Sequence, residues 1–147
     1  MRRSEINLEK RRWTIPRERS KNDKAHVVHL SPLALQIAES VPNLGDMLFG
    51  TVNDFGRMKR HLDVAITNQH GSALEHWTLH DLRRTCASGM AQLNVPPHIV
   101  DKILNHTSSA LRGIALVYNR YSYVSERQEA LDLWAQHVQK LVKRAVL

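Results

Sequence analysis

Residues 77–106 read WTLHDLRRTCASGMAQLNVPPHIVDKILNH, and this segment predicts two helices joined by a stiff turn. Thr78 has the side chain of a helix N-cap, and apolar residues recur at helical spacing as far as Leu93. The run Asn94-Val95-Pro96-Pro97 ends this helix, because proline has no backbone N–H to donate. A short helix with an apolar face is expected to follow, up to Leu104.

Upstream of these helices the sequence favours strands. Two short β-prone runs occupy residues 12–15 and 26–30, and residues 17–24 between them are polar and charged. Together they predict a β-hairpin over residues 11–30 with a basic tip.

Two further helices are predicted between the hairpin and residue 77. Ser31 followed by Pro32 marks a helix start, since serine caps helices and proline is favoured at the first helical position. Asn53 or Asp54 is expected to cap a helix that ends at the cluster of residues 68–71.

A last helix is expected over residues 125–143, with an apolar stripe that includes Leu133 and Leu141, and residues 111–121 are expected to be helical in part. The predicted fold is α+β and predominantly helical: a helical bundle with a small N-terminal antiparallel hairpin or sheet. Residues 31–147 form the helical part of this single domain.

Composition fits one globular domain with a polyanionic partner. The chain has 147 residues, of which 42% are hydrophobic and 24% charged, which suits a folded protein with one modest core. Its formal charge is +7, and residues 1–24 hold nine basic against four acidic side chains. Such a basic balance indicates DNA, RNA or an anionic surface as the partner.

The sequence gives no sign of membrane insertion or export. Its apolar stretches are far shorter than a membrane span, and the Met-Arg-Arg start lacks the apolar core of a signal peptide. Cys86 is the one cysteine, so no internal disulfide can form, and its apolar helical setting favours a buried side chain. We expect a cytoplasmic protein with no membrane partner.

Four short motifs carry side chains that can act on a phosphodiester. In chain order they are Ser20-Lys21-Asn22-Asp23-Lys24, His80-Asp81-Leu82-Arg83-Arg84-Thr85, Leu104-Asn105-His106 and Val117-Tyr118-Asn119-Arg120-Tyr121. Each motif alone is common, but their order and spacing resemble the C-terminal catalytic domain of the tyrosine recombinases, in particular the phage integrase branch. The resemblance extends over residues 1–142.

This resemblance implies site-specific DNA recombination through a tyrosine nucleophile. Tyr118 matches the nucleophile, while Tyr121 and Tyr123 are competitors because Tyr118 follows His106 by more residues than is usual in the family. The implied reaction forms a 3′-phosphotyrosyl DNA intermediate and needs no metal or other cofactor. The implied partners are double-stranded DNA and, in addition, other recombinase protomers.

The remaining motifs supply the groups that surround the phosphate. A planar guanidinium can bind two nonbridging oxygens, so Arg83 is the expected phosphate clamp. His80, three residues earlier on the same helix face, is expected to bind that phosphate or to take the tyrosine proton. His106 matches the second histidine of the family, and Lys21 matches the hairpin lysine that protonates the leaving group better than Lys24 does.

Neighbouring basic side chains are expected to contact the DNA backbone and to make binding depend on salt. These expected DNA-binding residues are Arg17, Arg19, Lys24 and Arg84.

One part of the family pattern has no match. The first catalytic arginine lies upstream of the hairpin in the family, and Arg2 and Arg3 are too close to the hairpin to occupy its place. The chain is therefore expected to be a truncated, partial catalytic domain with impaired activity alone. Residues 1–10 are expected to be poorly ordered, since their partner strands would be lost.

Two other readings stay open. Residues 87–106 superficially resemble a helix-turn-helix, which would make the chain a non-enzymatic DNA-binding module or a remnant, although Lys102 is the one basic residue of the second helix. Nine histidines raise the question of a metal, but His76 and His80 flank a predicted helix start at Thr78, and no cluster with ligand spacing follows. No metal site is expected.

Overall fold

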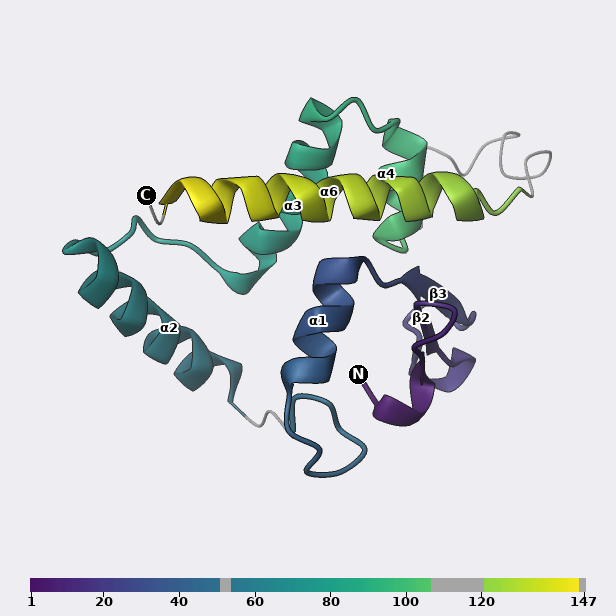
Figure 1. Cartoon of the computed structure of the whole chain (residues 1–147), viewed down its shortest axis with the longest axis horizontal. Coiled ribbons are helices and arrows are strands. Elements are labelled where there is room, and N and C mark those ends of the chain that lie inside the picture. The colour runs from purple at the N-terminus through teal and green to yellow at the C-terminus, as the bar shows by residue number, and fades with distance from the viewer. Residues whose placement is uncertain (51–53, 107–120, 146–147) are drawn as a thin grey trace.

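In a computed structural model, which describes residues 1–50, 54–106 and 121–145, the chain begins with a three-stranded antiparallel sheet in the order β1-β2-β3 (Figure 1). The strands are β1 (Ile6–Asn7), β2 (Arg12–Ile15) and β3 (His26–His29). In the register of the hairpin, Trp13 faces Val28 and Thr14 faces Val27. The tip between β2 and β3 contains a 3₁₀ turn, Arg17–Arg19.

Five helices follow within the described part of the chain. They are α1 (Pro32–Ser40), α2 (Phe55–His70), α3 (Leu79–Gln92), α4 (Pro97–Ile103) and α6 (Val124–Ala145). The predicted α+β, predominantly helical class is confirmed. The expected helical part of residues 111–121 lies, except for Tyr121, outside the described residues.

The helix starts follow the predicted caps. The Ser31 hydroxyl accepts from the Ala34 N–H at 3.3 Å, and the Asp54 carboxylate accepts from the Arg57 N–H at 2.8 Å. Thr78 forms a capping box with Asp81, whose Oδ2 lies 2.8 Å from the Thr78 backbone nitrogen. Each of these helices therefore begins where a polar side chain satisfies its first N–H groups.

The expectation that residues 1–10 are poorly ordered is wrong. Ile6 and Asn7 pair with Trp13 and Arg12 of β2 as a third strand. A 3₁₀ turn, Arg3–Glu5, precedes this strand. The segment is ordered because its backbone and side chains find partners within the chain itself.

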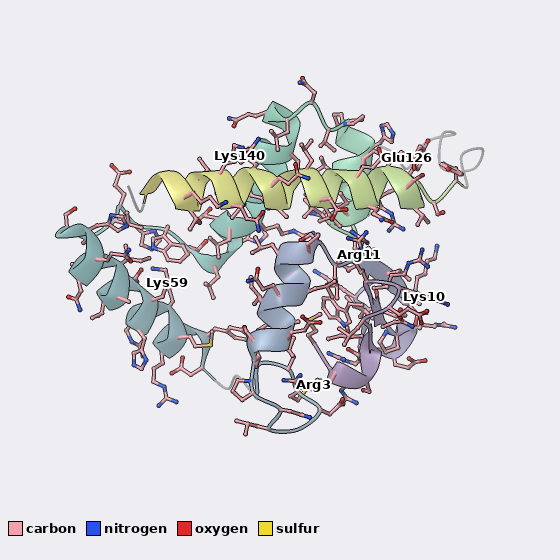
Figure 2. All side chains as sticks on the ribbon, viewed as in Figure 1. Arg3, Lys10, Arg11, Lys59, Glu126 and Lys140 are labelled. Carbon is pink, nitrogen blue, oxygen red and sulfur yellow. The ribbon has the colours of Figure 1, made fainter. Side chains whose placement is uncertain are left out.

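Two charged side chains hold this segment. The Arg3 guanidinium donates to the carbonyls of Val41 and Pro42 at 2.8 and 2.9 Å, just after α1 (Figure 2). The Glu5 carboxylate, which is 10% exposed, accepts from the indole N–H of Trp13 at 3.0 Å and pairs with Arg19. The N-terminal residues are thus fastened to both the sheet and the end of α1.

The main core lies where α6 crosses α3 and α4 (Figure 1). Met90 and Ile99 are fully buried, and Val95, Val100 and Ala130 complete the buried cluster. Cys86 also packs against this cluster, and burial raises the pKa of its thiol.

Helix α6 also holds the sheet. Asp132 lies 3.2 Å from Nε2 of His29 on β3 and 4.0 Å from the Arg11 guanidinium. Arg127 donates to the Val27 carbonyl at 3.3 Å. The same helix therefore completes the core on one side and carries the sheet on another.

Helix α2 lies apart from the other helices (Figure 1) and is tied to the segment that leads into α3. The Trp77 indole N–H donates to Asp63 at 2.9 Å, and the Lys59 ammonium lies 2.6 Å from Asp63 and 4.4 Å from the centre of the Trp77 ring. Among the residues that are described, no helix is both long and apolar enough to cross a membrane.

Gly89 gives a test of the packing between α3 and α6. A Cβ at this position would clash with the Trp134 ring, 2.8 Å from its Cη2 atom, and that ring is stacked on His137. Gly89→Ala is therefore expected to lower the free energy of unfolding by about 1–3 kcal/mol in urea denaturation. The exposed neighbour Ser88→Ala is the control. A more stable Gly89→Ala protein, as helix propensity alone would give, contradicts this packing.

Glu5 predicts how stability depends on pH. Burial raises its pKa, but hydrogen bonds from Trp13, Arg19 and the Arg2 N–H outweigh burial and lower the pKa from 4.5 to about 2. A carboxyl with a lowered folded pKa stabilises the protein above its unfolded pKa, and this contribution is lost as the pH falls through about 2. Denaturation curves between pH 5 and pH 2, in steps of roughly one unit, should show a smaller loss of stability for Glu5→Gln than for wild type. Identical losses would contradict the ionised, bonded state of Glu5.

Candidate active site

The C-terminal end of α4 organises the candidate site. The helix ends in a Schellman motif: Asn105 has φ of 51°, the His106 N–H bonds the Asp101 carbonyl at 2.9 Å, and the Asn105 N–H bonds the Lys102 carbonyl at 3.3 Å. Asparagine is one of the few residues other than glycine that tolerate this left-handed backbone. The motif ends the helix and fixes the backbone of His106 directly beyond it, because the His106 N–H takes part in the motif.

Two carbonyls at this helix end accept from side chains of distant elements. The Leu104 carbonyl accepts from Arg83 of α3, and the Asn105 carbonyl accepts from Asn22 of the hairpin at 2.9 Å. His26 of β3 lies against the Ile103 carbonyl, whose interaction raises the pKa of the imidazole.

Arg83 is half-buried on α3, and its Nη2 donates to the Leu104 carbonyl. This bond holds the guanidinium beside His26, where it adds positive charge together with Arg127. Burial is the main cause that lowers the pKa of His26, and the two guanidinium groups lower it further. His26 is therefore neutral near pH 7, and Arg83 and Arg127 supply the positive charge around it.

His106 is exposed beyond the end of α4, and its Nδ1 lies 3.3 Å from a carboxylate oxygen of Asp101. A carboxylate at this distance can accept from an Nδ1–H, which leaves Nε2 for another partner. Asp101 thus orients the histidine that the sequence singled out. His80 is exposed in the first turn of α3, one helical turn before Arg83.

The hairpin tip brings Lys21 to this helix end. Lys21 and Lys24 are exposed on either side of Asn22, whose amide bonds the Asn105 carbonyl. Arg17 makes two bonds to Asp23, at 2.8 and 2.6 Å, which lower the pKa of that carboxyl. Lys21 is therefore the neighbour of a residue, Asn22, whose side chain is bonded to the end of α4.

The other expected DNA-binding residues are engaged in ion pairs at the surface. Arg19 pairs with Glu5, and Arg84 lies 3.0 Å from Asp81 within α3. The Arg84–Asp81 pair is exposed and weak, so a phosphate can compete with Asp81 for the Arg84 guanidinium.

Tyr118, the expected nucleophile, lies outside the described residues. The competing Tyr123 is half-buried, with its ring 5.0 Å from His98 and 4.8 Å from Tyr121, and the Lys102 ammonium lies 5.5 Å from the ring centre. These contacts give Tyr123 a packing role ahead of α6.

Two alternative sites gain no support from this geometry. No group of three or more His, Cys, Asp or Glu side chains in the described ranges could hold a metal ion. The resemblance of residues 87–106 to a helix-turn-helix is limited, because the second helix, α4, has only seven residues and Lys102 is its one Lys or Arg.

Three contributors to the site were missed from sequence: Asn22, His26 and Asp101. Asn22 lies within the motif of residues 20–24, in which the sequence pointed to the lysines alone. Asn105 at a helix end is a recognisable C-cap signal, and it could have drawn attention to the carbonyls that need donors there.

Comparison with known proteins supplies the family. The family model described as the phage integrase family matches residues 1–123. The prophage integrase IntA of Escherichia coli (strain K12) is 24% identical over 137 residues, which cover 91% of this chain and 33% of that protein. The chain thus spans about a third of the length of this relative. No solved structure matches.

The left-handed Asn105 predicts a sharp difference between two substitutions. Asn105→Val is expected to lower the free energy of unfolding by about 1–3 kcal/mol, because a β-branched side chain is strained at φ of 51°. Asn105→Gly should be nearly neutral in the same urea titration. Equal effects of the two substitutions would contradict the Schellman ending of α4.

Proposed function

The chain belongs to the phage integrase family, and we propose that it carries the catalytic site of a tyrosine-type DNA strand transferase. The observation that carries this proposal is the meeting of Arg83, His106 and the Lys21 hairpin tip at the end of α4. These are side chains suited to a phosphodiester, and they come from three separate motifs of the sequence.

In the proposed reaction the Tyr118 oxygen attacks a DNA phosphorus and forms a 3′-phosphotyrosyl bond. The bond from phosphorus to the 5′-oxygen breaks, and that oxygen takes a proton from the Lys21 ammonium. His80 takes the tyrosine proton. A 5′-hydroxyl of another strand can reverse the step and join the new end, so no metal or nucleotide is consumed.

Arg83 and His106 stabilise the charge that develops on the nonbridging oxygens. A guanidinium held in advance by the Leu104 carbonyl costs little further ordering when the phosphate arrives. His106, oriented by Asp101, offers its second ring nitrogen to the same phosphate.

Double-stranded DNA is the proposed substrate, with Arg17, Arg19, Lys24 and Arg84 as backbone contacts and further protomers as assembly partners. Acting on DNA, the protein would work in the cytoplasm. Arg3 is held by two backbone carbonyls and is not proposed as a second phosphate clamp.

A covalent adduct tests this function with a substrate pool that samples many target sequences. End-labelled duplexes with randomised sequence and a single nick should yield a covalent protein–DNA adduct that survives denaturing gels. The adduct accumulates because the short fragment that carries the new 5′-hydroxyl diffuses away and cannot reverse the step. Tyr118→Phe is expected to abolish the adduct, since phenylalanine has no nucleophilic oxygen.

Tyr121→Phe and Tyr123→Phe are the matched controls and should retain the adduct. An adduct that persists in Tyr118→Phe, or that maps to Tyr121 by peptide mass, overturns the assignment. Sequence-selective binding in which no adduct forms would instead favour the non-enzymatic DNA-binding module.

A further inference from the structure

The end of α4 needs donors from elsewhere in the chain. A helix leaves its last four carbonyls without intrahelical partners, and buried carbonyls are rarely left unpaired. At α4 the Schellman motif satisfies the Asp101 and Lys102 carbonyls, Arg83 donates to the Leu104 carbonyl, and Asn22 donates to the Asn105 carbonyl. Two of these donors are therefore side chains from outside the helix.

Asn22 is the donor that lies farthest from α4 along the sequence. Its half-buried amide reaches across 83 positions of sequence to the Asn105 carbonyl, at 2.9 Å. The other polar contacts that hold the tip stay within the sheet region, as Arg17 binds Asp23 and Arg19 binds Glu5. Among the described hydrogen bonds, the Asn22 bond is the one that joins residues 17–25 to the helical part.

We propose that Asn22 is a positioning residue that docks the hairpin tip on the end of α4 and so holds Lys21 beside the phosphate. This inference rests on the proposed function. Lys21 is the immediate neighbour of Asn22, so the anchor limits how far the ammonium can move away from His106. Restricting a proton donor in this way lowers the entropic cost of reaching the transition state.

The contact requires a hydrogen-bond donor at this position. The Asn22 Nδ2 donates to a carbonyl at the negative end of a helix dipole, and a carboxylate there would be repelled and could donate nothing. Asn22→Asp should therefore undock the tip at least as strongly as Asn22→Ala, although it keeps the size of the side chain.

A change of leaving group separates positioning from general damage to the fold. A DNA substrate with sulfur in place of the bridging 5′-oxygen expels a thiolate, which needs no proton because thiols ionise near pH 8.5. Lys21→Ala should slow cleavage of ordinary DNA by roughly a hundred- to ten-thousandfold. Asn22→Ala and Asn22→Asp should slow it by about ten- to a hundredfold. All three should recover wild-type adduct rates on the sulfur substrate.

Glu18→Gln, an exposed change in the same tip, is the matched control and should cleave both substrates at the wild-type rate. Gly89→Ala disturbs the packing of α3 on α6, so any loss of cleavage rate in this variant should be equally large on the sulfur substrate and on ordinary DNA. An Asn22→Ala defect of equal size on both substrates would overturn the positioning role, as would full activity of Asn22→Ala on ordinary DNA.

Hydrogen exchange of the free protein tests docking independently of DNA cleavage. Asn22→Ala should speed amide exchange in residues 17–25 and leave α3 unchanged, whereas Glu18→Gln should change neither. Unchanged exchange in the tip overturns the docking even if the wild type cleaves DNA. A wild type that forms no adduct with either substrate overturns the proposed function and the positioning of Lys21 by Asn22, while exchange still decides whether the tip docks.

Discussion

The backbone carbonyls at the end of α4 are the constraint on which the arrangement of the site depends. A carbonyl without a donor in a half-buried position is costly, so this helix end must recruit partners. Its donors are the backbone N–H groups of its own Schellman motif, Arg83 of α3 and Asn22 of the hairpin. A requirement of helix termination thereby brings together three motifs that are far apart in sequence.

Much of the fold could be predicted because its signals are local. The caps at Ser31 and Thr78 depend on residues within one helical turn, and both helices begin there. Strand β1 was missed because a two-residue strand is ordered by tertiary contacts such as the bond from Trp13 to Glu5. The predicted stripe of α6 was incomplete for the same reason: Leu133 is 39% exposed and Ala135 is buried, since this helix contacts both the core and the sheet side.

The residues of the candidate site also differ in whether the sequence could predict them. Arg83 and His106 could be predicted because they stand inside motifs whose order identifies the phage integrase family. The role of Asn22 could not, since it donates to a carbonyl 83 positions away and nothing in its neighbours marks this use. Tyr118 lies outside the described residues, so its role stands on the resemblance.

The contact between the hairpin tip and the end of α4 is the central claim, and a paramagnetic label measures it most directly. A nitroxide on Lys24→Cys, in a Cys86→Ala background, should broaden the backbone amide signals of Asn105 and His106 relative to the reduced label. This broadening should weaken when Asn22 is also replaced by alanine. Sharp amide signals for these two residues in the labelled protein would show that the tip does not rest on the end of α4 and would contradict the claim.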